Sequence, residues 1–268
     1  MTDYDCGTIK FLFWNIHRNQ KNIELVTRFG VENGIDIIAL CETGSLIDDQ
    51  INGYEIVKHI ATQDDINVFC RKMRVIYTRE RTRYCILRAE CGPPLIFAVV
   101  HLNSDMFSSG KQYRQVDIDT LCRDLSIEES KNGKNTFVIG DFNDNLFSDV
   151  VFGFTGLNVR VFKSSVESPT VRLHESEKDV FYNPMLNVYK DYESESIANG
   201  TYYYHGDSIQ WLCYDQIMMK EPLINRFVSN RLKIINKMCD VELVRNYKPD
   251  PHISDHMPIY CEFTKEGK

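Results

Sequence analysis

Short runs rich in β-branched and aromatic residues recur along the whole chain, and they constrain its fold more than any other feature. Each run has the length of a strand and is bounded by polar or turn-forming residues, which predicts β-strands. Several runs are apolar at nearly every position, which is typical of strands covered on both faces. In chain order the runs are IKFLFWNI, IDIIAL, INVFC, RVIYT, RYCILRAE, LIFAVVHL, TFVIG, LCYDQIMM and MPIYCEF.

Two segments between these runs have the apolar spacing of helices. The segment NQKNIELVTRFGVENG carries Ile23, Val26 and Phe29 on one face and ends in glycine, so it predicts a β-α-β start. A second helix is predicted between Lys111 and Lys131. The expected apolar face of the second helix consists of Tyr113, Val116, Ile118, Leu121, Leu125 and Ile127.

Strands that alternate with helices and tight turns predict a mixed α/β sandwich. No Pro/Gly/Ser-rich linker or repeat divides the chain, so a single domain over residues 1–268 is expected. The polar stretch from Ser164 to Ser196 is predicted to form surface loops with short elements.

Composition excludes several classes of protein. A net charge of −7 and a pI near 5.5 argue against coating nucleic acid through bulk positive charge. The nine cysteines include no C-x-x-C pair, which argues against zinc or redox chemistry. The N-terminus lacks a signal-peptide pattern and no apolar run is long enough to span a bilayer, so we expect a soluble, cytoplasmic protein.

Polar side chains interrupt or follow the apolar runs at several widely separated places. Loops at strand ends are where a rigid sheet can hold functional groups together. We therefore treat these residues as site candidates: Asn15, Glu42, His101, Asp141, Asn143, Asp215, Asp255 and His256.

Each candidate also has an ordinary structural interpretation. Asn15 can cap the following helix, Glu42 can end a strand in solvent, and His101 can be a hydrogen-bonded core histidine. The polar residues of GDFN, and those of SDHMP near the C-terminus, can be turn formers. Asp215 is harder to explain in this way, because a carboxylate in an apolar strand is costly unless it is paired.

The candidates together match the chemistry of phosphoester hydrolysis. Carboxylate oxygens from Glu42 and Asp255, with the amide oxygen of Asn15, suit Mg²⁺. Hydrolysis also needs a group that activates water and donors for the charge growing on phosphoryl oxygens. A buried Asp215 beside His256 would hold the imidazole in one tautomer and favour its charged form.

The order WN, E, HL, GDFN, YDQI, SDH resembles the endonuclease/exonuclease/phosphatase family, which has the DNase I-like fold. The resemblance runs from about Lys10 to Phe263, and GDFN and SDHMP are its most specific parts. It implies a four-layered α/β sandwich with two mixed sheets face to face and helices outside. It also implies hydrolysis of phosphodiesters or phosphomonoesters with Mg²⁺ or Mn²⁺.

The resemblance implies a metal site and departs from the family pattern beside it. Asn15, Glu42 and Asp255 would lie at the metal ion. Cys41 precedes the glutamate where many members have glutamine, and the residues before His101 lack an Asn-Thr pair. The segments after GDFN and before YDQI also lack the pattern of inositol polyphosphate phosphatases, so that subfamily is not expected.

The resemblance also implies catalytic roles. His101 would contact the scissile phosphate, and Asp141 would orient or deprotonate the attacking water. Asn143 would fix the water and the phosphate. Asp215 would support His256, which is expected to be catalytic either as a base or as a phosphate ligand.

The substrate is expected to be nucleic acid, and the alternatives are a phosphatase, a lipid phosphodiesterase or a binding domain without catalysis. Tyr113 and Arg114 are candidate substrate contacts after His101. The aromatic segment GTYYYHGDSIQW can stack bases or belong to the core. A basic hairpin can either contact phosphates or be a solvated edge. Its basic residues are Arg71, Lys72, Arg74, Arg79, Arg81, Arg83 and Arg88.

Overall fold

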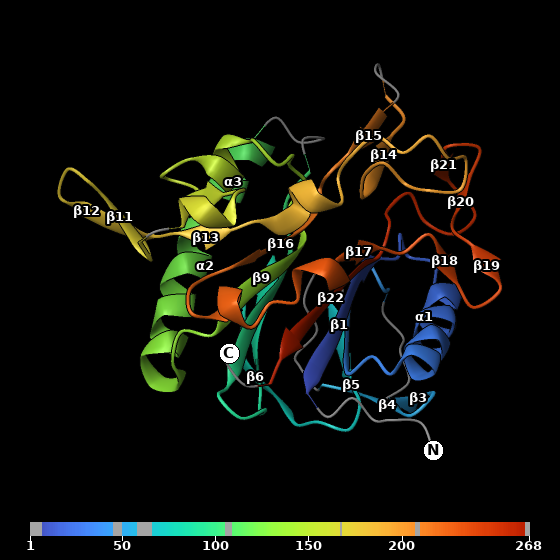
Figure 1. Cartoon of the computed structure of the whole chain (residues 1–268), viewed down its shortest axis with the longest axis horizontal. Coiled ribbons are helices and arrows are strands. Elements are labelled where there is room, and N and C mark those ends of the chain that lie inside the picture. Colours follow the sequence, from blue (N-terminus) through green and yellow to red (C-terminus); the bar gives the residue numbers. More distant parts are fainter. Residues whose placement is uncertain are drawn as a thin grey trace.

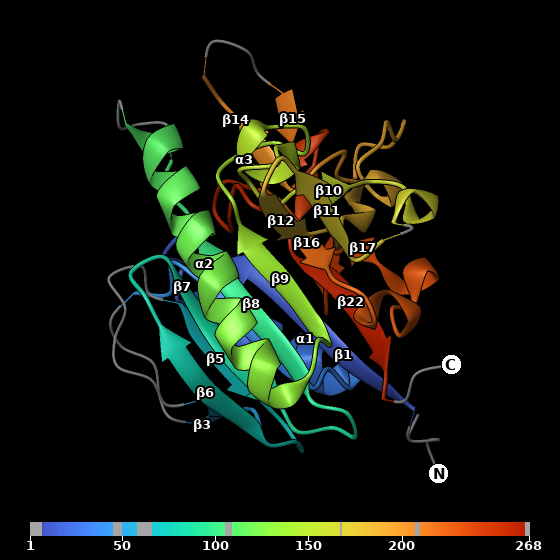
Figure 2. The same ribbon diagram turned by 90° about the vertical axis from the view of Figure 1, so that its left-hand side faces the viewer.

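Two seven-stranded sheets lie face to face in the chain, with helices on their outer surfaces (Figures 1 and 2). The computed structural model describes residues 7–44, 50–57, 66–104, 109–166, 168–206 and 210–265. Both sheets contain parallel and antiparallel pairs. This architecture confirms the predicted mixed α/β sandwich with four layers.

The first sheet has the strand order β17-β22-β1-β2-β5-β4-β3. Its first and last long strands in the sequence, β1 and β22, are antiparallel neighbours, and β1 is parallel to β2. The bounds are β1 Thr8–Asn15, β2 Ile37–Cys41, β3 Gln50–Ile51, β4 Tyr54–Ile56, β5 Asn67–Cys70, β17 Lys233–Ile234 and β22 Ile259–Thr264.

The second sheet has the strand order β10-β13-β16-β9-β8-β7-β6. Its centre combines a parallel pair, β8 with β9, and an antiparallel pair, β9 with β16. The bounds are β6 Val75–Glu80, β7 Tyr84–Ala89, β8 Leu95–His101, β9 Thr136–Asp141, β10 Val159–Arg160, β13 Phe181–Tyr182 and β16 Asp215–Met219.

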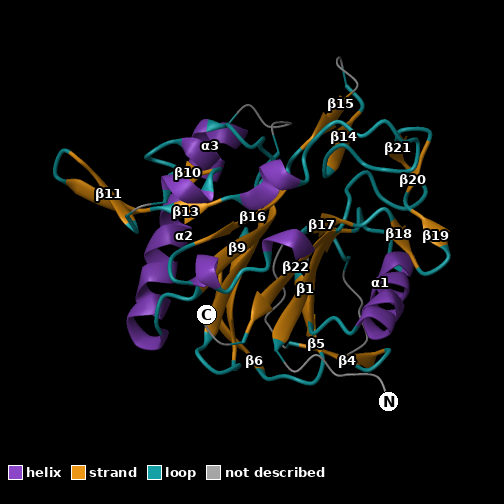
Figure 3. Cartoon of the chain, viewed as in Figure 1, coloured by secondary structure: helices purple, strands orange, loops and turns teal. Residues whose placement is uncertain are grey.

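The remaining elements are helices and small hairpins at the ends and edges of the sandwich (Figure 3). Among the helices that the structure describes, none combines the length and apolar character needed to cross a membrane. The helices are α1 Lys21–Asn33, α2 Gly110–Asn132, α3 Asp149–Phe152, η1 Lys163–Ser165, η2 Pro184–Asn187, η3 Leu223–Asn225 and η4 Ser229–Arg231. The hairpins are β11 Thr170–Leu173 with β12 Ser176–Asp179, β14 Tyr202–Tyr204 with β15 Gln210–Leu212, β18 Lys237–Met238 with β19 Val241–Glu242, and β20 Val244–Arg245 with β21 Lys248–Pro249.

Several of the apolar strand runs bury both of their faces, as their sequences predict, whereas β6 is only half-buried. In β1, Phe11 and Phe13 point into the core between the sheets, whereas Leu12 and Trp14 pack toward α1. The core between the sheets is centred on aromatic rings: Phe11 lies 5.2 Å from Phe137 of the other sheet, measured between ring centroids. These contacts fix how the ends of β1 and β9 lie relative to each other.

Helix α2 covers the outer face of the second sheet with only part of its predicted apolar face. Ile118, Leu121 and Leu125 are fully buried in one cluster with the outward side chains of β8 and β9. The other three predicted members of that face are exposed, which corrects the prediction: Tyr113, Val116 and Ile127. Helix α2 therefore touches the sheet along a narrow stripe.

Arginines of the basic hairpin hold α2 against the sheet. Arg79 Nη1 and Arg81 Nε each lie 2.9 Å from a carboxylate oxygen of Asp124 on α2, and the Tyr84 hydroxyl donates to the same carboxylate at 2.8 Å. Burial raises the pKa of Asp124, but the hydrogen bonds from Arg81 and Tyr84 and the arginine charges lower it below its usual value. The guanidinium groups of β6 and its turn are thus engaged within the fold.

Two stretches differ from the sequence predictions. The run LCYDQIMM is not one strand, because β15 ends at Leu212 and β16 begins at Asp215. The polar region from Ser164 to Ser196 does carry short elements, but one of them, β13, is buried and pairs with β10 and β16. The two buried aromatic residues of β13, Phe181 and Tyr182, are too short an apolar run to predict a strand among the surrounding polar residues.

Replacing Asp124 with asparagine is expected to lower the free energy of unfolding by about 2 kcal/mol, because a nearly buried carboxylate loses its charge beside two guanidinium groups. Urea denaturation of the two proteins measures this difference. Arg74→Ala is the control, because Arg74 pairs with Glu90 at the surface and should change stability far less. Equal effects of the two substitutions would contradict the anchoring role of Asp124.

Candidate active site

The second sheet brings three predicted site residues together at one end of its central strands. β9 ends at Asp141, and His101 at the end of the parallel strand β8 is directly beside it in register. β16 runs antiparallel to β9 and begins at Asp215, which is opposite Asp141 on its other side. Hydrogen-bond register alone therefore places three residues that are up to 114 positions apart in one row.

The first sheet places its candidates against this row. Asn15 ends β1, Glu42 follows β2, and the parallel register of these strands sets Asn15 beside Cys41. The Asn15 amide nitrogen donates to Asp141 Oδ2 and to Glu42 Oε1, both at 3.1 Å. Its amide oxygen faces away and accepts the backbone N–H of His17. In this orientation the Asn15 amide nitrogen binds two carboxylates, and the amide oxygen is turned away from them.

Asp141 is 1% exposed and is fixed by several donors. Its Oδ1 accepts the backbone N–H of Asn143 at 2.8 Å. The Asn143 amide also lies 3.3 Å from Asp141 Oδ2 and donates to the carbonyl of Leu102 at 2.9 Å. The GDFN segment therefore forms a turn, and Asn143 of that turn orients Asp141.

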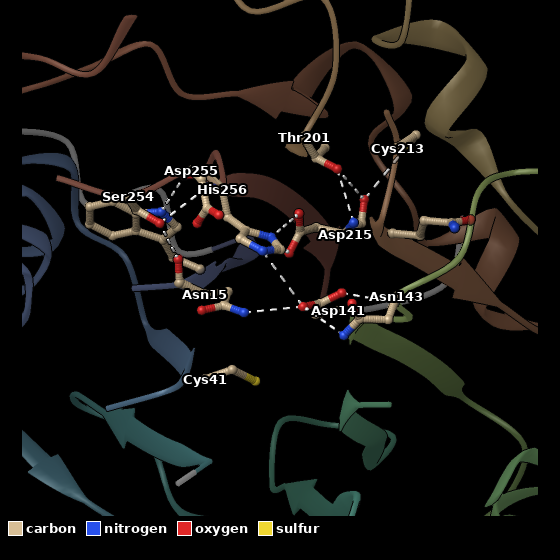
Figure 4. A network of polar contacts seen from close by, with 12 residues as sticks. Asn15, Cys41, Asp141, Asn143, Thr201, Cys213, Asp215, Ser254, Asp255 and His256 are labelled. Atoms are coloured by element: carbon tan, nitrogen blue, oxygen red, sulfur yellow. Dashed lines mark hydrogen bonds and ion pairs between the residues drawn. The ribbon is translucent and has the colours of Figure 1, made fainter. Parts of the chain in front are cut away.

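His256 and Asp215 form a buried pair beside Asp141 (Figure 4). The Nδ1 atom of His256 lies 2.9 Å from Asp215 Oδ2, and its Nε2 lies 3.8 Å from Asp141 Oδ2. The Thr201 hydroxyl accepts the Asp215 backbone N–H at 2.9 Å. Ser254 accepts the His256 N–H and donates to the carbonyl of Asn15, which links the SDH turn to β1.

The charges of this pair follow from its surroundings. Burial would lower the pKa of His256, but the carboxylates of Asp215 and Asp141 outweigh burial and raise the pKa to about 10. Burial raises the pKa of the Asp215 carboxyl, and the charge of His256 opposes that rise. We therefore place one proton on His256 Nδ1, in the contact with Asp215. The second ring proton is on Nε2 and is directed at Asp141.

His101 presents its Nε2 to the same group of carboxylates. This atom lies 3.6 Å from Glu42 Oε1 and 3.8 Å from Asp141 Oδ2, and the side chain is 13% exposed. Within the described part of the chain, its Nδ1 is buried without a hydrogen bond. His101 thus approaches Asp141 from the neighbouring strand β8, and His256 approaches it from the turn that precedes β22 of the other sheet.

Four non-glycine residues around the site have a left-handed backbone conformation. They are His17, Arg18, Glu42 and Asn143, with φ between 48° and 55°. Such conformations are uncommon for residues other than glycine and asparagine, and they cluster at functional sites. Here they turn the chain sharply after β1, β2 and β9, so that the side chains at the strand ends face one another.

The residues present fit a divalent cation with oxygen ligands. Glu42 and Asp141 converge on the Asn15 amide, and Asp255 Oδ1 is buried without a hydrogen bond among the described residues, 3.2 Å from His17 Nδ1. Ligand atoms of Asp141, Asp215 and His256 also lie within 4.8 Å of one another, but the last two are engaged with each other. Burial raises the pKa of the Cys41 thiol, so no thiolate competes with the hard oxygen donors.

The two predicted substrate contacts lie in different environments. Tyr113 is 55% exposed on the first turn of α2. Arg114 is 2% exposed, donates to the carbonyl of Asn103 at 2.8 Å, and lies 3.3 Å from an Asp144 carboxylate oxygen. The prediction that Arg114 contacts substrate does not fit this placement, since its guanidinium holds the loop after β9 in place.

Several residues of the site are absent from the sequence-based set. Thr201 and Ser254 orient the Asp215–His256 pair, and the Tyr202 ring lies 4.6 Å from the His256 ring. Burial raises the pKa of Tyr202 to about 12, so it remains a protonated phenol. Ser254 could have been found from its place beside Asp255, whereas no spacing pointed to Thr201. The half-buried Tyr202 shows that GTYYYHGDSIQW belongs partly to the core and partly to the site.

Comparison of sequences finds no match, because no family model and no curated protein is significantly similar to the chain. Comparison of structures finds many. An endonuclease/exonuclease/phosphatase family protein from Bacteroides thetaiotaomicron has 13% identity and a TM-score of 0.55, covering 96% of this chain and 95% of that one. The endonuclease domain of the retrotransposon TRAS1 has 11% identity and a TM-score of 0.56, with 96% and 98% covered. D. rerio TDP2 complexed with a single-strand DNA product has 16% identity and a TM-score of 0.53, with 96% and 98% covered.

These similarities extend over nearly the whole chain at low identity. The chain therefore has the DNase I-like fold of the endonuclease/exonuclease/phosphatase family, which confirms the fold that the motifs implied.

The proton on His256 is expected to depend on Asp215. In metal-free protein, NMR titration of the imidazole should give a pKa near 10 for wild type. In Asp215→Asn the pKa should fall to the usual value of about 6.5 or below, because burial then opposes the charge. The stability that the raised pKa of His256 contributes should be fully present below about pH 6.5 and be lost as the pH rises through about 10. An unchanged His256 pKa in Asp215→Asn would contradict the pairing.

Proposed function

We propose that the chain is a phosphoesterase that uses Mg²⁺ or Mn²⁺ and hydrolyses phosphodiester bonds of nucleic acid. The observation that carries the proposal is the convergence of Asp141, His101 and the Asp215–His256 pair beside Glu42. A carboxylate held between two imidazoles, next to oxygen ligands for a cation, supplies the groups that phosphoester hydrolysis requires.

Asp141 is proposed to orient and deprotonate the attacking water. It has the geometry of a general base, because Asn15 and Asn143 fix both of its oxygens while one edge remains directed at the imidazoles. The raised pKa of His256 supports the same assignment, since an imidazole that is protonated at neutral pH is a poor base. Asn143 would position the water and the phosphate through its amide.

His256 and His101 are proposed to donate to phosphoryl oxygens. The Nε2–H of His256 is held in place by Asp215 behind it, which avoids reorganisation as charge develops. His101 would contact the scissile phosphate from the opposite side of Asp141. The phenol of Tyr202 is available as a further neutral donor beside His256.

Glu42 and Asp255 are proposed to hold the cation, with Asn15 fixing the orientation of Glu42. The cation would supply positive charge to a phosphate that enters a site lined by carboxylates. Support for nucleic acid as substrate comes from two structural neighbours, an endonuclease domain and a TDP2 complexed with single-strand DNA.

The proposal predicts metal-dependent cleavage of end-labelled DNA or RNA that chelator abolishes. Asp141→Asn and His256→Ala should each lower kcat by about 10²- to 10⁴-fold, because each removes a group acting on the reacting atoms. His174→Ala is the matched control, since His174 is an exposed histidine in the turn between β11 and β12. Cleavage that persists in both site variants would overturn the proposal, and cleavage of phosphomonoesters alone would move the activity to a phosphatase.

Metal binding by Glu42 can be tested without any substrate. Titration calorimetry of wild type with Mn²⁺ should show saturable binding, and Glu42→Gln should weaken it by at least about tenfold because a charged ligand is lost. Glu90→Gln, which removes a carboxylate paired with Arg74 at the surface, should leave the titration unchanged. Identical titrations of wild type and Glu42→Gln would remove Glu42 from the metal site.

A further inference from the structure

Two phenylalanine side chains are exposed on the segment that follows the GDFN turn. Phe147 is 63% exposed and Phe152, at the end of α3, is 36% exposed. Their ring centroids lie 5.8 Å apart with an angle of 55° between the planes, so the rings form one aromatic surface. Most phenylalanines that the structure describes are buried or half-buried, and Phe162 is a third exposed one, at 62%. The contact between the exposed rings of Phe147 and Phe152 is a feature that core packing does not explain.

The exposure of Phe147 is imposed by its neighbours on both sides. Leu146 is fully buried, and the Asn145 side chain accepts the backbone N–H groups of Leu146 and Cys213 at 3.1 and 3.2 Å. On the other side, Ser148 caps α3 by accepting the N–H of Val151. The backbone is therefore anchored before and after Phe147, and the ring is presented to solvent by a well-bonded segment.

The anchoring continues toward the site and toward α2. The carbonyl of Asp144 accepts from the Gln216 amide at 2.8 Å on β16, and its carboxylate pairs with the buried Arg114. Lys111 Nζ lies 2.6 Å from Asp149 and joins the first turn of α2 to α3. The segment that carries the aromatic pair is thus hydrogen-bonded to β16, the strand that begins with Asp215.

The aromatic pair lies close to the proposed reacting groups. Phe147 follows Asn143 by four residues, which limits the separation of their Cα atoms to about 14 Å. In Figure 2, α3 lies beyond the carboxyl end of β9, the end that carries Asp141. A nucleic acid with one phosphate at Asp141 would therefore carry its neighbouring nucleotides past these rings.

We propose that Phe147 and Phe152 form an aromatic platform on which bases of a single-stranded substrate stack. This inference rests on the proposed function and specifies its substrate. Bases stack on exposed aromatic side chains without regard to sequence, and only an unpaired strand offers free base faces. In a protein with a charge of −7, such stacking would supply affinity that bulk electrostatics does not.

A binding experiment on a catalytically impaired protein tests the platform apart from cleavage. The full chain carrying His256→Ala is titrated by fluorescence anisotropy with a short single-stranded oligothymidylate and with the same strand carrying abasic residues. Adding Phe147→Ala and Phe152→Ala should weaken binding of the normal strand by at least about fivefold. Binding of the abasic strand should not change, because only contacts to bases are lost.

Matched substitutions separate stacking from general apolar contact and from folding defects. Phe147→Trp should retain the affinity, whereas Phe147→Leu, which keeps an apolar side chain without a ring, should lose it. Ile127→Ala, at an exposed apolar residue in the last turns of α2, should have no effect. Circular dichroism of each variant confirms that the fold is intact.

The outcomes distinguish this inference from the proposed function. Wild-type cleavage of oligonucleotides together with unchanged binding by the double phenylalanine variant would overturn the platform and leave the function standing. Equal losses on normal and abasic strands would also overturn it. A change from dimer to monomer in light scattering, without a change in nucleic-acid affinity, would assign the rings to a contact between copies instead. If wild type neither binds nor cleaves any oligonucleotide, both the platform and the nucleic-acid substrate are rejected.

Discussion

The hydrogen bond between the Asn15 amide and Asp141 Oδ2 joins the two sheets at the point where the site forms. Asn15 ends β1, an inner strand of one sheet, and Asp141 ends β9, the central strand of the other. The two strands are brought into this position by the rings of Phe11 and Phe137, which pack edge to face deeper in the core. Every other candidate residue is placed by register or by a tight turn relative to one of these two ends.

The site concentrates negative charge in a nearly dry environment, and the chain offsets it locally. Asp215 is paired with His256, Asp141 is held by amides, and Glu42 and Asp255 lie near Arg18 and His17 at the surface. This arrangement leaves carboxylate oxygens that a cation can reach without leaving a buried charge unpaired. A buried carboxylate is also neutralised away from the site, where Asp124 of α2 is paired with arginines of the β6–β7 hairpin.

The sequence predicted those features that depend on local composition. Apolar runs identified the central strands, because β1, β2, β8, β9 and β16 are buried on both faces and need apolar residues at successive positions. Polar residues at their ends supplied the site candidates, because each interrupts an apolar run at a strand end, and the structure brings several of them together. The motifs then supplied the fold, which the structural comparisons confirm.

Features that depend on distant partners were not predictable in this way. The sequence alone suggests that the arginines of the basic hairpin are available to contact a substrate. The packing of α2 shows that Asp124 binds two of them. Arg114 looks like a substrate contact for the same reason, although Asp144 and the carbonyl of Asn103 hold it inside. Thr201 carries no signal, since its role arises from a hydrogen bond to a strand 14 residues later.

The central claim is that side chains from two sheets form one site for a divalent cation beside Asp141. Anomalous diffraction from crystals soaked in Mn²⁺ tests it directly, because the scattering locates the ion without reference to activity. The account predicts a peak about 2.2 Å from an oxygen of Glu42 and within the group formed by Asn15, Asp141 and Asp255. A peak bound elsewhere on the chain, or no peak at saturating Mn²⁺, would contradict it.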